Sequence, residues 1–333
     1  MRRLASPGRL VVAGLALLVV VGLILWLTPS SDYVFLPDRA RPVAPLVKVD
    51  SRRPPKEPGG IYFVDIRIRH ATLFEQLFSR LPEGGQLVPA RAVNAPGQND
   101  TQRRQADLRQ MSFSQQVAAY VAERAAGLDA RATFSGATVD ATFPGLPASG
   151  KILPTDVIVS VDGSPVRKVA DLRRLITAHA AAPLRLGVRR GSSLLQITLR
   201  AVRRAGRPVI GVQVEQAATV KLPVSVTIDA GGVGGPSAGL AFALDVLETL
   251  GRDVDHGYTV AATGQIGLDG SVSPIGGVTQ KAIGVRRSGI EVFLVPAGDN
   301  ARDARRHAGN VRVIAVQSFQ QALRALATLP RKG

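Results

Sequence analysis

The chain of 333 residues contains no cysteine and only four histidines. Without cysteine there can be no disulfide framework, no thiol nucleophile and no zinc site with thiolate ligands. The histidines are too far apart for HExxH or a similar metal-ligand spacing; they are His70, His179, His256 and His307. We therefore expect no metal site, and nothing in the composition points to another cofactor. The 45% hydrophobic content is that of a globular protein with a core.

Acidic residues are also scarce. The chain has 25 Asp and Glu against 42 Lys and Arg, a formal net charge of +17. Such a balance can indicate nucleic-acid binding, but the arginines are scattered and form no run longer than two. Aromatic residues make up only 5% of the chain and do not alternate with the basic ones as in an RNA-binding motif. We expect a solvated basic surface and no nucleic-acid partner, with attraction to an anionic membrane surface as the alternative.

One long stretch lacks charge altogether, from Leu10 to Leu27. As a helix it would rise about 27 Å, enough to cross the hydrocarbon layer of a membrane. Its length favours an uncleaved anchor over a cleaved signal peptide. The positive-inside rule, applied to the flanking arginines, predicts residues 1–9 in the cytoplasm and the rest of the chain outside. The sequence thus predicts a single-pass cell-membrane protein with an extracytoplasmic body.

The segment after this run divides into a linker and a folded region. Residues 28–58 are rich in proline and arginine and are expected to form a linker. Residues 59–127 are expected to form an α/β region that packs with a later domain. It should contain a strand at Ile61–Arg69, a loop at Pro82–Gln98, and helices at Thr72–Leu81, Asn99–Met111 and Phe113–Ala126.

Residues 130–203 have the pattern of short strands around one amphipathic helix, Val169–Ala180. The run SGKILPTDVIVSVDGSPV, residues 149–166, resembles the most recognisable segment of bacterial PDZ domains. That resemblance implies a peptide slot between the helix and the strand Ala137–Thr142, where a substrate would add as a further strand. The expected peptide-binding residues are Gly136, Ala137, Thr138 and Val139.

Part of the same region, Gly145–Lys151, is close to a phosphate-binding P-loop. The residue after the lysine is Ile152, which cannot supply the hydroxyl that such a loop places on Mg²⁺. The segment also leads into a strand instead of a helix. We therefore expect a turn and no nucleotide.

A glycine-rich stretch with a serine follows the strand Val224–Asp229. Its sequence is AGGVGGPSAGL, residues 230–240, and the helix Ala238–Leu250 is expected to begin within it. Ser237 therefore lies at a strand-to-helix junction, where glycines permit close approach of a ligand and the helix terminus offers unpaired N–H donors. These are the components of an oxyanion hole beside a nucleophile, with Gly235 and Pro236 as supporting residues.

A serine nucleophile requires a base. Arginine stays protonated, so lysine is the basic side chain to consider. Lys281 lies among apolar residues in the first turns of an expected helix, whereas Lys221 looks exposed and Lys332 is in the polar tail. The alternative is an α/β-hydrolase esterase, because residues 235–239 fit GxSxG. Its acid and base would be Asp299 or Asp303 with His307.

Order and spacing over some 65 residues resemble the Lon protease catalytic domain. The matching features are GGPSAG around Ser237, Thr263-Gly264, the segment 272–277, Lys281 and the run 286–296. The resemblance implies a serine–lysine dyad in which Ser237 is the nucleophile, Lys281 the general base and Thr263 an orienting hydroxyl. Gly234 and Gln265 stand where Lon proper carries acidic residues, so no acidic helper is expected at those positions.

Together these features predict an α+β chain, with an N-terminal transmembrane helix at 10–27, a PDZ-like β-rich domain at 130–203 and a Lon-type α/β proteolytic domain at 206–330. The arrangement is similar to the bacterial single-pass PDZ-Lon proteins. The predicted function is ATP-independent serine endopeptidase activity on protein or peptide substrates, and the resemblance implies a possible homo-oligomer, a hexamer. The alternatives are a non-catalytic PDZ scaffold with a degenerate Lon fold and the α/β-hydrolase esterase.

Overall fold

The computed structural model describes residues 7–50, 59–79, 81–94, 99–179 and 182–332. Its main body is built on a six-stranded sheet with the order β18-β17-β14-β3-β1-β4. Strands β3, β14, β17 and β18 are parallel, and β1 is antiparallel to both of its neighbours. The strands are β1 (Pro29–Pro42), β3 (Gly60–Thr72), β4 (Gln86–Val88), β14 (Thr259–Ala262), β17 (Val292–Pro296) and β18 (Arg312–Val316).

Helices cover both faces of this sheet, because its central strands are apolar on both sides. In β3, Ile61 and Phe63 belong to the core on one face and Val64 to the core on the other. The first core is covered by α4 (Asp100–Ala125), α6 (Gly239–Thr249) and α9 (Phe319–Ala327), the second by α7 (Val278–Arg287) and α8 (Asp299–His307).

The expected linker is wrong for the part of it that the structure describes. Pro29–Pro42 forms β1, which pairs with β3 along most of its length, and Val47–Val49 forms β2, which pairs with β13 (Val226–Ile228). The short helix η1 (Ala44–Leu46) joins β1 to β2. A strand tolerates proline at positions where no N–H is needed for pairing with the neighbouring strand. Residues 51–58 lie outside the described part.

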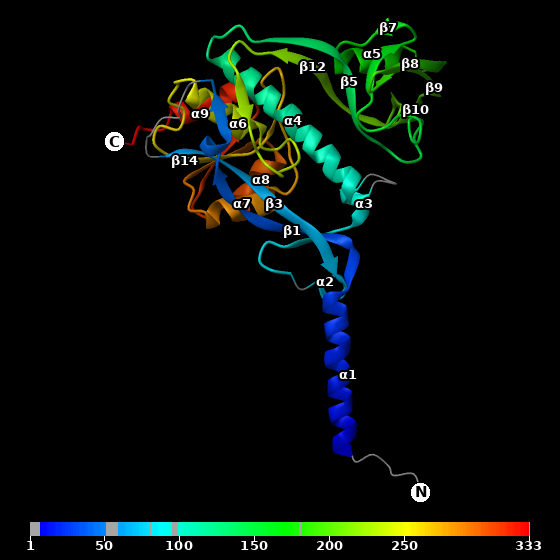
Figure 1. Ribbon diagram of the computed structural model, residues 1–333, viewed down its shortest axis with the longest axis vertical. Coiled ribbons are helices and arrows are strands. Elements are labelled where there is room, and N and C mark those ends of the chain that lie inside the picture. The colour runs from blue at the N-terminus through cyan, green and yellow to red at the C-terminus, as the bar shows by residue number, and fades with distance from the viewer. Residues whose placement is uncertain (1–6, 51–58, 80, 95–98, 180–181, 333) are drawn as a thin grey trace.

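The region after β3 contains more structure than the predicted loop. Helix α2 (Leu73–Phe78) lies within the helix expected at Thr72–Leu81, whereas β4 and the short helix α3 (Ala90–Val93) lie within the predicted loop. The two helices expected after residue 98 form one continuous helix, α4, which runs diagonally across the body in Figure 1. Neither proline nor glycine interrupts it. Asn99 caps its start, because its side chain accepts a hydrogen bond from Gln102 N at 2.9 Å.

A second sheet, with the order β12-β5-β6-β8-β9, forms the separate lobe in Figure 1. Strand β7 pairs with β6, and helix α5 packs on the sheet's own apolar core. The elements are β5 (Arg131–Thr142), β6 (Val157–Val161), β7 (Ser164–Pro165), α5 (Val169–Ala178), β8 (Pro183–Arg190), β9 (Ser193–Arg200) and β12 (Val212–Lys221). Smaller hairpins are β10 (Val202–Arg204) with β11 (Arg207–Val209), and β15 (Gln265–Ile266) with β16 (Val272–Ser273).

The predicted transmembrane anchor is not supported. Residues 7–27 form helix α1, which projects from the body in Figure 1. Nevertheless, none of the helices in the described part of the chain combines the length and the apolar character needed to cross a membrane. The transmembrane element of the predicted fold class and the single-pass cell-membrane location are therefore wrong, and residues 1–6 lie outside the described part.

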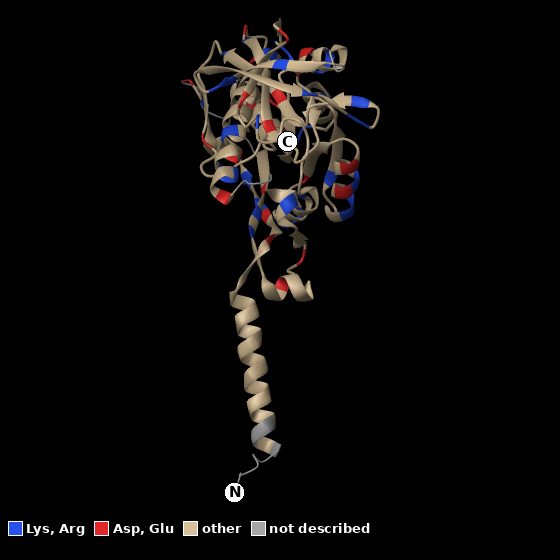
Figure 2. Cartoon of the chain, turned by 90° about the vertical axis from the view of Figure 1, so that its right-hand side faces the viewer, with Lys and Arg blue, Asp and Glu red and all other residues tan. Residues whose placement is uncertain are grey.

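Charged residues are spread over the body. In the view of Figure 2, Lys and Arg are interspersed with Asp and Glu over the body. Several ion pairs join near neighbours at the surface, such as Arg306 with Asp303 and Arg131 with Asp129. Exposed pairs of this kind contribute only about 0–1 kcal/mol each to stability.

Candidate active site

Ser237 lies in the loop between β13 and α6. Gly235 has a φ of +81°, a conformation that favours glycine, and this turn leads the chain toward Ser237. The serine's own carbonyl oxygen is held from the β14 side. It accepts hydrogen bonds from Gly264 N at 2.8 Å and from Thr263 Oγ1 at 3.1 Å.

Lys281 comes from a different element, the first turn of α7. Gly277, with a φ of +67°, is the residue before this helix. Its left-handed conformation starts the helix that carries Lys281 to the serine loop. The lysine is only 2% exposed. Its Nζ lies 2.6 Å from Ser237 Oγ and 3.0 Å from Thr263 Oγ1. The structure thus brings together the three residues that the sequence analysis expected to act together.

Burial controls the charge of this lysine. Loss of hydration disfavours the ammonium form and lowers the pKa of Lys281 to about 8. The carboxylate of Asp65 acts in the opposite direction, because a negative charge stabilises the ammonium. Asp65 is on β3, and burial raises the pKa of its own carboxyl group. The lysine can therefore change protonation state near neutral pH.

The serine and the lysine open into a cleft of about 590 Å³. Its walls come from both lobes: α4 and β3 on one side, and β5 and β12 on the other. Asp140 and Glu215 lie on the latter wall, beside Gln265, whose Nε2 donates to Glu215 Oε2 at 3.3 Å. Burial and the neighbouring Glu215 raise the pKa of Asp140 to about 8. Its volume lies within the usual range of ligand-binding clefts.

The expected peptide slot has no open backbone edge. Ala137 and Thr138 pair with Ile158 and Val157 of β6 on one side, and β5 pairs with β12 on the other. Gly136 N and Val139 N donate to the carbonyl oxygens of Arg167 and Asp156. Since strand addition requires unpaired N–H and C=O groups, the predicted slot at Gly136, Ala137, Thr138 and Val139 is wrong.

The residues of the alternative esterase lie elsewhere. Asp299 and Asp303 on α8 pair with Arg302 and Arg306, and His307 ends the same helix. None of these three candidates lines the cleft that contains Ser237. Lys221 is exposed at the end of β12. The arrangement within the described residues therefore offers Ser237 one nearby base, Lys281.

Sequence reasoning missed the residues that approach the serine loop from outside. Asp107 and Ser114 of α4 contact the loop, and Asp65, Asp140 and Glu215 line the cleft. Buried Ser114 was the one faint signal, because it interrupts the apolar face formed by Met111, Val117 and Ala118. The carboxylates had no such signal, since charged residues in a strand usually face solvent.

Residues 195–326 match the family described as the Lon protease (S16) C-terminal proteolytic domain. This region is thus similar to the Lon proteolytic domain, as the sequence predicted. It includes Ser237, Thr263 and Lys281. The match leaves α1 to α4 and most of the second sheet outside it.

Curated relatives with similar sequences are Lon proteases. The chain is 33% identical over 112 residues to Lon protease 2 of Bacillus subtilis, covering 33% of this chain and 19% of that protein. It is 38% identical over 109 residues to Lon protease 2 of Herpetosiphon aurantiacus, covering 31% of this chain and 13% of that protein. The chain thus spans less than a fifth of the length of either relative.

A structural neighbour is the PDZ domain of an SdrC-like protein from Listeria monocytogenes. It is 22% identical, has a TM-score of 0.23, and covers 25% of this chain and 90% of that chain. The PDZ domain of an SdrC-like protein from Listeria innocua is 20% identical, with a TM-score of 0.22 and coverage of 24% and 92%. The chain thus has PDZ-like neighbours, and these likenesses support no statement about its ligands.

Proposed function

We propose that this protein is an ATP-independent serine endopeptidase that uses a Ser237–Lys281 dyad. The observation that carries the proposal is the 2.6 Å separation between Ser237 Oγ and the Nζ of a buried lysine whose pKa is lowered to about 8. An exposed lysine, with a pKa near 10.4, would be protonated at neutral pH and could not accept a proton. A buried lysine with a lowered pKa can be neutral near that pH and can accept the proton of the serine hydroxyl.

The reaction follows from this pair. Neutral Lys281 accepts the proton of Ser237 as Oγ bonds to the substrate's carbonyl carbon, and the carbonyl oxygen becomes an oxyanion. The lysine ammonium then donates that proton to the amide nitrogen, the C–N bond breaks and an acyl-enzyme remains. Water attacks the acyl carbon with Lys281 again as base, which releases the acid product and restores Ser237.

Two backbone N–H groups support this role. In the described part of the chain, neither the N–H of Ser237 nor that of Ala238 makes a hydrogen bond. Both precede the start of α6, where the helix dipole favours negative charge. They are candidate donors to the oxyanion, and one such donor contributes roughly 10²–10³ in rate in serine proteases.

The proposed substrates are proteins or peptides with an extended segment that enters the cleft. The segment Gly145–Lys151 forms turns, and the helix that a P-loop requires does not follow it. This supports cleavage without ATP and therefore a preference for unfolded substrates. Assembly into a homo-oligomer, a hexamer by resemblance, remains a prediction that light scattering can check.

The test is cleavage of an unstructured protein such as casein by the full chain, without nucleotide. Wild type should cut it, Ser237→Ala should be inactive, and the exposed-site control Ser193→Ala should cut at the wild-type rate. An inactive wild type that binds casein would instead favour the non-catalytic scaffold. Cleavage that survives Ser237→Ala would contradict the assignment of the nucleophile, and loss of activity in His307→Ala would favour the esterase arrangement.

A further inference from the structure

The loop that carries the proposed nucleophile has little stiffness of its own. Four of the six residues before Ser237 are glycine, namely Gly231, Gly232, Gly234 and Gly235. Glycine loses more conformational freedom on ordering than any other residue. A displacement of about 1 Å at a reacting group can reduce a rate by about 10²-fold. The loop must therefore be held by groups outside it.

Helix α4 holds the loop on the side opposite Thr263 and Gly264. Gly235 N donates to the carbonyl oxygen of Asp107 at 2.8 Å. Ser114 Oγ donates to the carbonyl oxygen of Pro236 at 3.1 Å. A serine inside a helix usually bonds to its own helix four residues back, so this contact to another segment is distinctive.

The glycine-rich loop and helix α4 also pack too closely to admit an additional Cβ atom at two positions. A Cβ atom at Gly234 would lie 2.7 Å from Asp107 Cβ, and one at Gly239 would lie 2.6 Å from Ser114 Oγ. Gly234 is not in the left-handed region, so its backbone alone would accept alanine. Glycine is required there because α4 is so close.

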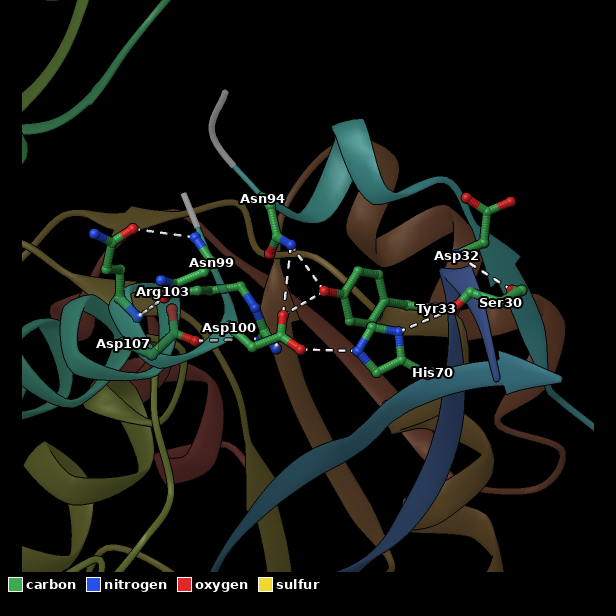
Figure 3. Close-up of polar contacts among 10 residues, drawn as sticks. Ser30, Asp32, Tyr33, His70, Asn94, Asn99, Asp100, Arg103 and Asp107 are labelled. Atoms are coloured by element: carbon green, nitrogen blue, oxygen red, sulfur yellow. Dashed lines mark hydrogen bonds and ion pairs between the residues drawn. The ribbon is translucent and has the colours of Figure 1, made fainter. Parts of the chain in front are cut away.

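Helix α4 is itself anchored at both ends. Near its start, the carboxylate of Asp100 accepts hydrogen bonds from the hydroxyl of Tyr33 and is 2.8 Å from His70 Nε2 (Figure 3). Its C-terminal half packs into the main core through Val117 and Val121. The helix is thus a fixed surface against which the glycine loop rests.

We propose that α4 is a positioning element of the active site, in which Ser114 and the turn at Asp107 hold the backbone on which Ser237 reacts. This inference rests on the proposed function for its catalytic consequence. Residues 100–125 lie outside the region that matches the Lon proteolytic domain. The working site therefore extends beyond that domain, and Ser114 acts through the loop without touching substrate.

The first test compares two serine-to-alanine changes that lie two residues apart in α4, one on its buried face and one on its exposed face. Ser114→Ala should lower kcat for a peptide about 5- to 10-fold, the effect of one positioning hydrogen bond, and leave KM within about twofold. It should also speed hydrogen exchange of the amides of Gly235 and Gly239. The control Ser112→Ala, on the exposed face of the same helix, should change neither quantity.

The second test uses the missing Cβ. Gly234→Ala should lower kcat because the new methyl group collides with Asp107 Cβ. Adding Asp107→Gly removes that atom and should restore much of the lost kcat, whereas adding Asp107→Ala keeps the atom and should not. Melting temperatures of all three variants identify any that fail to fold.

The exchange measurement separates this inference from the proposed function. If wild type hydrolyses no peptide, the proposed function fails, and exchange at Gly235 still decides whether α4 holds the loop. Wild-type exchange and wild-type kcat in Ser114→Ala would overturn the inference, as would equal rescue by Asp107→Gly and Asp107→Ala.

Discussion

The two ends of helix α6 carry buried ionisable groups, yet only one end has the geometry of an active site. At the N-terminal end, Ser237 faces Lys281, whose pKa burial lowers to about 8. In the C-terminal half, burial raises the pKa of Asp245 and of Glu248 to about 7. All three groups thus titrate near neutrality because they have lost hydration.

The difference lies in what surrounds them. Lys281 adjoins a cleft and a hydroxyl at hydrogen-bond distance. Asp245 is 3% exposed and its Oδ2 makes no hydrogen bond in the described structure, while Glu248 accepts from Val254 N at 2.7 Å. A pKa near neutrality therefore marks burial, and a reacting partner together with an open cleft marks catalysis.

The largest effect that would sharpen this contrast is the loss of the base. Lys281→Arg keeps a positive charge that cannot be removed at neutral pH, so it cannot accept the serine proton. Activity should fall roughly 10³-fold or more. Lys281→Met, which keeps an unbranched apolar stem, should be equally inactive and guards against misfolding of the arginine variant. Peptide hydrolysis beside a melting curve measures both, and an active arginine variant would break the contrast.

A smaller effect is expected at Thr263, which is fully buried. Thr263→Val removes the hydroxyl that lies 3.0 Å from Lys281 Nζ and donates to the Ser237 carbonyl. Loss of these hydrogen bonds should lower kcat about 5- to 30-fold. Because the hydroxyl accepts from the ammonium form, its loss should also move the pH–rate rise to lower pH. A rise that stays in place would show that Thr263 does not influence the lysine.

The smallest effect on activity is expected at the other end of α6. Asp245→Asn should leave peptide hydrolysis unchanged and increase stability, since the amide is neutral at every pH. The pKa of Asp245 is raised on folding, so wild type should lose stability relative to the variant as pH rises from about 4 to 7, by about 2–4 kcal/mol.

Denaturant unfolding at pH 4 and pH 7 measures this difference. The exposed, non-titrating control Ser193→Ala should give the same difference from wild type at both pH values. An Asp245→Asn variant with wild-type stability at pH 7, or with reduced activity, would show that the two ends of α6 are not as different as their geometry indicates.

The sequence was most informative where chemistry depends on local pattern. The glycine-rich junction placed Ser237, and the resemblance to the Lon catalytic domain singled out Lys281 from Lys221 and Lys332. It was least informative about contacts between distant segments. Nothing local shows that Pro29–Pro42 joins the main sheet, or that Ser114 meets the serine loop 122 residues away. The prediction of the peptide slot failed for the same reason, because β5 pairs with β12, a strand at the other end of the second lobe's sequence.

The apolar run near the N-terminus taught a different lesson. Periodicity and hydropathy there predicted a helix, and α1 is one. The inference from an apolar helix to a membrane span was a further step. None of the described helices meets the requirements for such a span. A pattern of this kind predicts local structure more securely than it predicts location.

The central claim is that burial makes Lys281 a base near neutral pH, and an NMR titration of the lysine side chains tests it most directly. The chain has only seven lysines, so labelled lysine gives few signals, and Lys281→Arg identifies the one that belongs to Lys281. We predict that this signal titrates near pH 8, well below the ordinary lysine value of about 10.4. Titration of the Lys281 signal near that ordinary value would contradict the account.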